Sequence, residues 1–195
     1  MKVILASASP RRQALLQQLG IEPVVQPASF AEVGGRAELA HEVALANAKG
    51  KCDAVYAEAG DELPVVAADT IVVIDNVILG KPQDEAEAQA MLTRLSGRTH
   101  QVMTGVAVRY KGQQLAKVCT TDVSFRELTA AEIAAYIATK EPLDKAGAYG
   151  IQGMGGLFVA EIDGDYYGVM GLPICMLHEM LWQVGCDAGT EKQKG

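Results

Sequence analysis

Residues 3–20 read VILASASPRRQALLQQLG, a stretch that combines an apolar run, a short polar turn and a helical pattern. The apolar run predicts a buried strand. Ser9 suits the N-cap of a helix, Pro10 suits its first position and Gly20 suits its end. The chain therefore begins with a strand that leads directly into a helix.

Arg11 and Arg12 fall in the first turn of this predicted helix. A helix N-terminus already carries partial positive charge and unpaired N–H groups, so two cations there are unfavourable unless an anion lies between them. A phosphate group would resolve the conflict. The alternative is that both side chains point into solvent, where the electrostatic penalty is small.

Size and charge limit the classes of function. The chain has 195 residues, of which 49% are hydrophobic and 5% aromatic, enough to build one domain or two closely joined lobes. Seventeen basic and 24 acidic residues give a formal net charge of −7, which argues against general affinity for nucleic acid polymers. A small anionic ligand needs only a local cluster of cations and is compatible with this balance.

The sequence contains no sign of membrane insertion or secretion. No apolar run approaches the roughly 20 residues of a membrane helix, and Met1-Lys2-Val3 begins a strand instead of a signal peptide. We expect a cytoplasmic protein that does not bind membranes. The cysteines are interpreted as reduced thiols because they form no CxxC pair, and the histidines as structural because they lack triad or metal spacing. The cysteines are Cys52, Cys119, Cys175 and Cys186, and the histidines are His41, His100 and His178.

The order of predicted elements mixes helices with long hairpins, which indicates an α/β fold with a mixed sheet and flanking helices. A helix over residues 38–55 is expected to turn Leu39, Val43, Ala46 and Ala48 toward the core. The strand signals are apolar runs on either side of Asp69-Thr70, a tight turn at Asp75-Asn76 and a hairpin over 101–125. The helix signals are an N-cap at Asp84, a capping box at Thr129 and Glu132, and the start of a last helix at Pro173. Residues 187–195 lack apolar side chains, and we expect them to form a disordered tail.

Four polar features interrupt these patterns. Asp69 and Thr70 lie inside an apolar β run, where an unpaired carboxylate would be costly to bury, so Asp69 needs a cation. Lys81 lies between Gly80 and Pro82 on a stiff loop, and residues 141–153 form a long aperiodic stretch of the kind that is usually functional. Glu32 is a loop carboxylate without a packing role. Each residue alone can also be interpreted as an ordinary turn or surface residue.

The combination is more specific than its parts. The motifs Ser-x-Ser-Pro-Arg-Arg at 7–12, Ala-Asp-Thr at 68–70, Gly-Lys-Pro at 80–82 and Asp-Lys-Ala-Gly-Ala-Tyr-Gly-Ile-Gln-Gly at 144–153 together resemble the Maf family of nucleoside triphosphate pyrophosphatases. The resemblance runs from Ile4 to about Leu181.

Within the family the chain is similar to the branch that hydrolyses dTTP and UTP. That branch carries the residues found here as Arg11, Thr70 and Gln152, whereas the 7-methyl-GTP branch has tryptophan in place of Arg11.

The resemblance implies a single Maf-like domain over residues 1–186, with two lobes around a central cleft and a fold similar to inosine triphosphate pyrophosphatase. It implies a homodimer that hydrolyses a nucleoside triphosphate between the α- and β-phosphates, releases pyrophosphate and requires Mg²⁺ or Mn²⁺. Modified pyrimidine nucleotides are further candidate substrates.

The resemblance also implies roles for single residues. Asp69 matches the catalytic acid, and Glu32 matches an acidic residue near the metal, so both are candidate metal ligands. Ser7 and Ser9 belong to the substrate-binding motif. Arg12, Lys49 and Lys81 match phosphate-contacting cations, although the family often has Lys-Ala where this chain has Lys49-Gly50, which leaves Lys51 as an alternative to Lys49.

The residue chemistry is consistent with these roles. Catalysis on a triphosphate consists mostly of positioning and charge stabilisation, which cations provide. Mg²⁺ accepts a few carboxylate oxygens together with substrate phosphates, and Asp69 could equally accept the proton of the attacking water. Gln152 offers both a donor and an acceptor to a thymine or uracil edge, and Arg11 could donate to a pyrimidine carbonyl.

Two alternatives come from other functional classes. The family has an association with inhibition of septum formation, so a non-enzymatic regulator of cell division that acts through a protein partner is one. A nucleotide sensor that never turns its ligand over is the other, and the presence of Asp69 argues against it.

Overall fold

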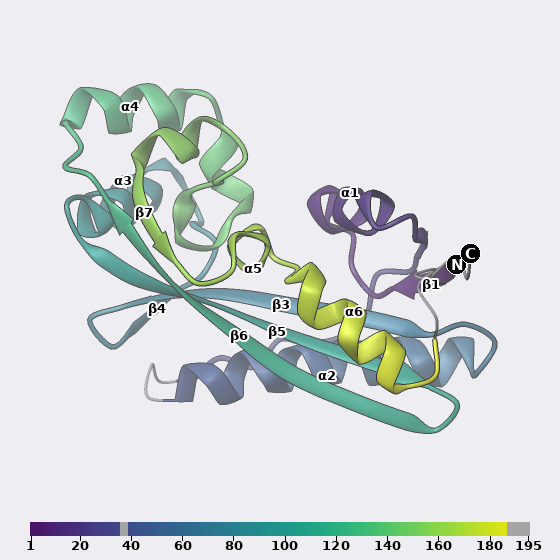
Figure 1. Ribbon diagram of the computed structural model, residues 1–195. Helices are drawn as coiled ribbons and strands as arrows, with labels where there is room; N and C mark the ends of the chain where they lie inside the picture. Colours follow the sequence, from purple (N-terminus) through teal and green to yellow (C-terminus); the bar gives the residue numbers. More distant parts are fainter. Residues whose placement is uncertain (36–38, 187–195) are drawn as a thin grey trace, which may run out of the picture.

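A mixed sheet runs through the centre of the computed structural model, which describes residues 1–35 and 39–186 (Figure 1). The strands are β1 (Lys2–Leu5), β2 (Glu22–Val25), β3 (Val65–Ile74), β4 (Val77–Leu79), β5 (Thr99–Tyr110), β6 (Gln113–Phe125) and β7 (Val159–Asp163). Their order is β2-β1-β3-β5-β6-β7, with β4 paired to β3 outside this path. β1 is parallel to β2 and β3, whereas the remaining pairs are antiparallel, so the predicted mixed sheet is confirmed.

Helices cover both faces of this sheet (Figure 1). They are α1 (Pro10–Gln18), α2 (Ala40–Ala59), α3 (Glu85–Leu95), α4 (Ala130–Ala138), α5 (Tyr166–Met170) and α6 (Ile174–Gln183). The segment predicted to be aperiodic contains the short 3-10 turns Glu141–Asp144 and Ala146–Ala148. No helix in the described parts of the chain is both long and apolar enough to cross a membrane. The predicted tail at 187–195 lies outside the described residues.

Two hydrophobic clusters build the two lobes. One joins β1, α1 and α6 through buried residues such as Leu5, Leu16 and Leu177. The other joins α3 and α4 through buried residues such as Leu92 and Ile133. The long strands β3, β5 and β6 connect the two clusters, so the two lobes share one sheet (Figure 1).

Several local signals in the sequence are confirmed. Asp84 caps α3 by accepting a hydrogen bond from the Glu87 backbone at 2.8 Å. Thr129 and Glu132 form the complete capping box of α4. Asp75 and Asn76 both have positive φ, as the tight turn between β3 and β4 requires.

Strand β3 differs from the prediction at its centre. It does not stop on either side of Asp69 and Thr70 but continues through them, because their backbones pair with Gly105 and Thr104 of β5. The opposite edge of β3 pairs with β1 only at Val65 and Val66, and with β4 only from Val72 onward. Among the described strands, the middle of β3 therefore has one open edge, and the two polar residues lie there.

The inward face of α2 also differs from the prediction. Val43 and Ala48 are buried as predicted, whereas Leu39 is 51% exposed and Ala46 is exposed. The buried stripe instead includes Ala44 and Asn47.

Gly105 explains how closely this face approaches the sheet. A Cβ atom there would lie 2.2 Å from the Ala44 carbonyl oxygen, so only glycine allows α2 to pack this near to β5. The close contact brings the next turns of α2 within reach of Asp69.

Candidate active site

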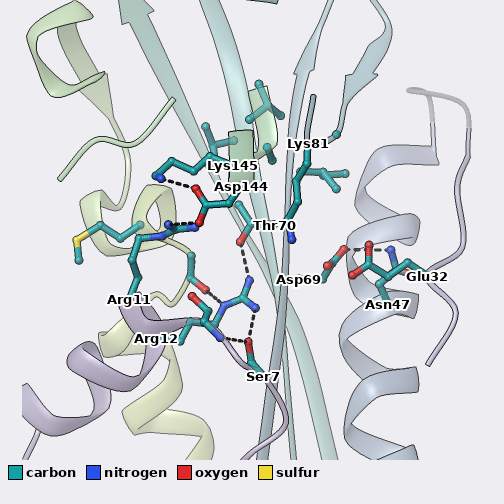
Figure 2. A pocket seen from close by; sticks show the side chains of 18 of the residues that line it. Ser7, Arg11, Arg12, Glu32, Asn47, Asp69, Thr70, Lys81, Asp144 and Lys145 are labelled. Atoms are coloured by element: carbon teal, nitrogen blue, oxygen red, sulfur yellow. Dashed lines mark hydrogen bonds and ion pairs between the residues drawn. The ribbon is translucent and has the colours of Figure 1, made fainter. Parts of the chain in front are cut away.

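A cavity of about 760 Å³ lies at the open edge of β3, between the two lobes (Figure 2). It collects nine of the ten residues that the sequence predicts for the site. They are Ser7, Ser9, Arg11, Arg12, Glu32, Asp69, Thr70, Lys81 and Gln152. Among the described residues, those with a charge that line it are five cations and three carboxylates, although the whole chain has a formal net charge of −7. This local excess of positive charge suits an anionic ligand.

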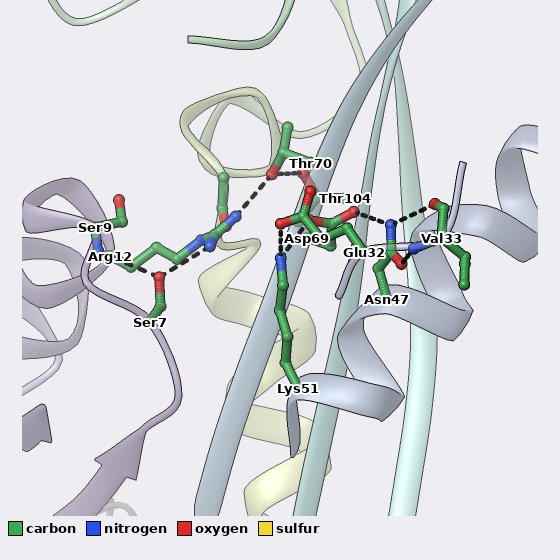
Figure 3. A network of polar contacts seen from close by, with 11 residues as sticks. Ser7, Ser9, Arg12, Glu32, Val33, Asn47, Lys51, Asp69, Thr70 and Thr104 are labelled. Carbon is green, nitrogen blue, oxygen red and sulfur yellow. Dashed lines mark hydrogen bonds and ion pairs between the residues drawn. The ribbon is translucent and has the colours of Figure 1, made fainter. Parts of the chain in front are cut away.

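Asp69 lies at the base of the cavity and is only 6% exposed. Its Oδ1 accepts a hydrogen bond from Lys51 Nζ at 2.7 Å, and its Oδ2 accepts one from Asn47 Nδ2 at 3.0 Å (Figure 3). The cation that a buried carboxylate needs is therefore Lys51.

Lys49 is the predicted residue that the structure does not bring to the cavity. Its side chain is exposed on α2, and among the described residues the α2 lysine that lines the cavity is Lys51. Residues 47 and 51 lie one turn apart on the same face of a helix, whereas residue 49 points roughly to the opposite side. Of the two lysines that the sequence offers for phosphate contact, the structure brings Lys51 and not Lys49 to the cavity.

Glu32 shares Lys51 with Asp69. Its Oε1 lies 2.5 Å from Lys51 Nζ, and its side chain is 60% exposed. The neighbouring Val33 is held by Asn47, whose Oδ1 accepts from the Val33 N–H at 2.8 Å and whose Nδ2 donates to the Val33 carbonyl at 3.2 Å. Asn47 therefore ties the loop that carries Glu32 to the catalytic aspartate predicted on β3.

Arg12 crosses from α1 to the opposite wall of the cavity (Figures 2 and 3). Its Nε donates to the Gly171 carbonyl at 2.8 Å, its Nη1 to Ser7 Oγ at 3.1 Å and its Nη2 to Thr70 Oγ1 at 3.2 Å. Burial lowers the pKa of this guanidinium to about 10, with Asp69 opposing the shift, so Arg12 is charged at neutral pH.

Ser7 and Ser9 shape the turn before α1. Ser9 occupies the N-cap as predicted, but its side chain makes no capping hydrogen bond. Its backbone N–H instead donates to Ser7 Oγ at 3.2 Å. The N–H groups at the start of α1 thus gain no capping side chain from Ser9. The residues of this first turn are among those that line the cavity.

Arg11 reaches across the cleft to the other lobe. Its Nη1 lies 3.5 Å from Asp144 Oδ2, and Lys145 Nζ donates to Asp144 Oδ1 at 2.5 Å and to the Glu141 carbonyl at 2.7 Å. The segment that supplies Asp144 also supplies Gln152, which is exposed and lines the same cavity. Figure 2 shows Arg11, Asp144 and Lys145 on the other side of Asp69 from Asn47.

Thr70 lines the cavity and accepts a hydrogen bond from Arg12. Its Oγ1 also lies 2.9 Å from Thr104 Oγ1, and both hydroxyls belong to one network (Figure 3). The resemblance associates Thr70 with the branch that hydrolyses dTTP and UTP, and a role of Thr70 in the choice of base stays a prediction. Lys81 points into the cavity from the segment after β4, facing Asp69 (Figure 2).

The donor set of Asp69 and Glu32 fits a divalent cation. Two carboxylate oxygens converge on one ammonium at 2.7 and 2.5 Å, so the site already holds a positive charge between them. Oxygen ligands of this kind suit Mg²⁺ or Mn²⁺ when substrate phosphates supply further oxygens. Within the described residues, no group of three or more histidine, cysteine or acidic side chains could hold a metal by itself.

Residue patterns alone did not identify Asn47, Asp144 and Thr104 as parts of this network. Asn47 carries the one available signal, because a polar residue lies there on the buried face of a helix. Asp144 belongs to the motif at 144–153 with no separate signal of its own, and Thr104 resembles any other residue of a strand.

The fold and the cavity define a class, namely an α/β protein with a cation-rich site for a small anionic ligand between two lobes. The solved structure of the Staphylococcus aureus Ham1 protein has this fold. The alignment covers 94% of this chain and 99% of the Ham1 chain, with a TM-score of 0.51 and 13% sequence identity. A family model described as Maf-like protein matches residues 2–184, and the chain belongs to this family.

Two curated relatives are similar along nearly their whole length. The dTTP/UTP pyrophosphatase of Bacillus cytotoxicus is 50% identical over 189 residues, which cover 97% of each chain. The dTTP/UTP pyrophosphatase of Shigella sonnei is 48% identical over 177 residues, which cover 91% of this chain and 90% of that protein.

Proposed function

We propose that this protein hydrolyses dTTP and UTP to the nucleoside monophosphate and pyrophosphate. The observation that carries the proposal is the placement of buried Asp69 between Lys51 and Asn47, across the cavity from Arg12. A carboxylate that can accept a proton thus faces cations that can hold a triphosphate. The names of the two relatives support the choice of reaction and substrates.

The triphosphate binds between the two lobes. Arg12, Lys51 and Lys81 approach the cavity from α1, α2 and the segment after β4, so they can neutralise phosphate oxygens from three sides. Phosphoryl and nucleotidyl chemistry depends mainly on such positioning and charge stabilisation. The backbone N–H groups at the start of α1 add donors for the same anion.

Asp69 acts at the reacting phosphorus. In one role its carboxylate accepts the proton of the attacking water, and in the other it holds a metal ion together with Glu32. Asp69 and Glu32 would hold Mg²⁺ or Mn²⁺, which would neutralise charge on the phosphates. Lys51 balances the charge of both carboxylates, and Asn47 holds the Asp69 carboxylate in place.

The base binds at the wall made by Arg11 and Gln152. An amide side chain offers a donor and an acceptor, which match the N3–H and an adjacent carbonyl of thymine or uracil. Asp144 orients the Arg11 guanidinium toward this wall through their ion pair. A purine would leave these groups unmatched and poorly solvated.

The test is a substrate panel of dTTP, UTP, CTP, GTP and 7-methyl-GTP, with pyrophosphate release followed in the presence of Mg²⁺. Metal-dependent release from dTTP and UTP at a higher kcat/KM than from the purines is the expected result. Saturable binding without any release would favour a nucleotide sensor, and neither binding nor release would favour a regulator that acts through a protein partner.

We also propose that the protein is a homodimer and works in the cytoplasm. Sedimentation of the purified chain at micromolar concentration tests the first proposal, and fractionation of cells tests the second.

A further inference from the structure

Among the described residues, the Arg12 guanidinium makes three hydrogen bonds, which leaves two of its N–H donors without a partner there. A guanidinium has five N–H groups. Within residues 1–35 and 39–186, three of these groups donate to Gly171, Ser7 and Thr70. Two N–H groups remain for a ligand, which is the number that a bidentate phosphate contact uses. The orientation of the guanidinium therefore depends on how firmly its three acceptors are held.

The direction of each hydrogen bond around Thr70 follows from counting protons. A threonine hydroxyl has one proton. Thr104 donates its proton to the Gly168 carbonyl at 2.8 Å, so in its 2.9 Å contact with Thr70 it must accept. The proton of Thr70 is thereby committed to Thr104, and the hydroxyl of Thr70 faces Arg12 only as an acceptor.

Thr104 is also tied to the second acceptor of Arg12. The Gly168 carbonyl that takes the Thr104 proton accepts from the Gly171 N–H at 3.0 Å as well. Gly171 ends α5 with a φ of 107°, and its own carbonyl accepts from Arg12 Nε at 2.8 Å. One buried hydroxyl on β5 thus connects to both the Thr70 and the Gly171 acceptors.

Thr104 acts without touching the ligand. It is fully buried, with 0% exposure, and it is not among the described residues that line the cavity. We propose that Thr104 is a positioning residue that orients Arg12 toward the substrate phosphates, through Thr70 and the end of α5. The proposal rests on the phosphate-binding role of Arg12 in the proposed function.

The proposal is tested with Thr104→Val, which keeps the shape and removes the hydroxyl, and Thr104→Ser, which keeps the hydroxyl. The fold should tolerate Thr104→Val, because the Gly168 carbonyl retains its bond from Gly171. Thr104→Val should lower kcat/KM at least tenfold on every nucleotide of the panel, without changing the ratio of pyrimidine to purine. Thr104→Ser should stay within threefold of wild type.

A second arm separates positioning from general packing. Arg12→Lys keeps the charge but removes the forked donors, so adding Thr104→Val to Arg12→Lys should cost less than twofold further. A loss of tenfold in both backgrounds, an equal loss in the serine and valine variants, or no loss in Thr104→Val would overturn the proposal.

Binding of inorganic tripolyphosphate, measured by calorimetry, distinguishes this inference from the proposed function. If wild type released no pyrophosphate, the proposed reaction would fail, whereas a Kd at least tenfold weaker in Thr104→Val would still support the positioning role. If Thr104→Val did not fold, Thr104→Ala, which also removes the hydroxyl, would take its place with the same expectations, and equal Kd values in Thr104→Ala and Thr104→Ser would overturn the proposal.

Discussion

The ammonium of Lys51 lies 2.7 Å from the carboxylate of Asp69, although the two residues belong to a helix and a strand on different layers of the fold. The same ammonium lies 2.5 Å from Glu32. One lysine thus compensates two carboxylates at the base of a cavity whose other charges are mostly positive. Substrate phosphates and a divalent cation would both compete for its contacts, so we expect Lys51 to exchange partners when the nucleotide binds.

Exchange of Asp69 for asparagine should remove turnover while the fold persists. The amide can neither accept the proton of water nor hold a cation as a carboxylate does, so kcat should fall by about a hundredfold or more. Steady-state pyrophosphate release measures the loss, and the melting temperature monitors the fold. Asp53→Asn is the matched control, because Asp53 lies on α2 and pairs with Arg109. A rate near that of wild type for Asp69→Asn would refute the assignment.

The two lysines of α2 should respond differently to alanine. Lys51→Ala leaves Asp69 buried without its cation and should lower kcat/KM by at least about tenfold, equivalent to about 1.4 kcal/mol of transition-state stabilisation. Lys49→Ala changes an exposed side chain and should stay within twofold. Kinetics of both variants on dTTP decide between them, and a larger loss in Lys49→Ala would contradict the geometry.

Gln152 and Arg11 should control the choice of base. Gln152→Ala and Arg11→Trp should each reduce the ratio of kcat/KM for dTTP over GTP, because mismatched polar groups at the base edge are costly to desolvate. Lys81→Ala provides the comparison: it should weaken all nucleotides alike, since phosphates are common to all of them. Unchanged ratios in both base-wall variants would show that the base is recognised elsewhere.

Removal of divalent cations should stop the reaction. Excess EDTA is expected to abolish pyrophosphate release, and added Mg²⁺ or Mn²⁺ to restore it. Glu32→Gln should raise the metal concentration required for half-maximal rate, since a neutral amide is a weaker ligand than a carboxylate. Full activity of wild type in EDTA would remove the metal from the proposed mechanism.

His100 should make the fold sensitive to mild acid. Burial lowers its pKa from 6.5 to about 4, with Asp122 opposing the shift, and its Nε2 contacts Tyr149 Oη at 2.8 Å. The unfolded chain therefore binds a proton at a higher pH than the folded chain does. This contribution to stability is present above pH 6.5 and is lost as the pH falls toward 4, by on the order of 3 kcal/mol.

Urea unfolding between pH 7 and 4 measures this dependence. The loss of stability between these limits should be smaller in His100→Gln, which cannot be protonated. Parallel curves for wild type and His100→Gln would assign the acid sensitivity to other groups.

The sequence by itself determined the local structure. Signals that act over a few residues predicted the N-terminus of α3 at Asp84, the capping box of α4 at Thr129 and the turn at Asp75-Asn76. They were sufficient because caps and tight turns depend only on nearby backbone groups. The motifs, together with Glu32, also indicated the family and nine of the polar and charged side chains that line the cavity.

Only the tertiary structure decided which of these side chains meet. Lys51 and not Lys49 lines the cavity because of how α2 is rotated about its axis against the sheet. That rotation depends on the close contact between Gly105 and Ala44, two residues far apart in the sequence. Thr104 entered the network because its hydroxyl contacts residues 34 and 64 positions away. The short-range pattern of a helix or strand predicts which residues share a face. Whether two side chains form a hydrogen bond depends on the distance and angle between their atoms, and only the packing of segments far apart in the sequence sets these.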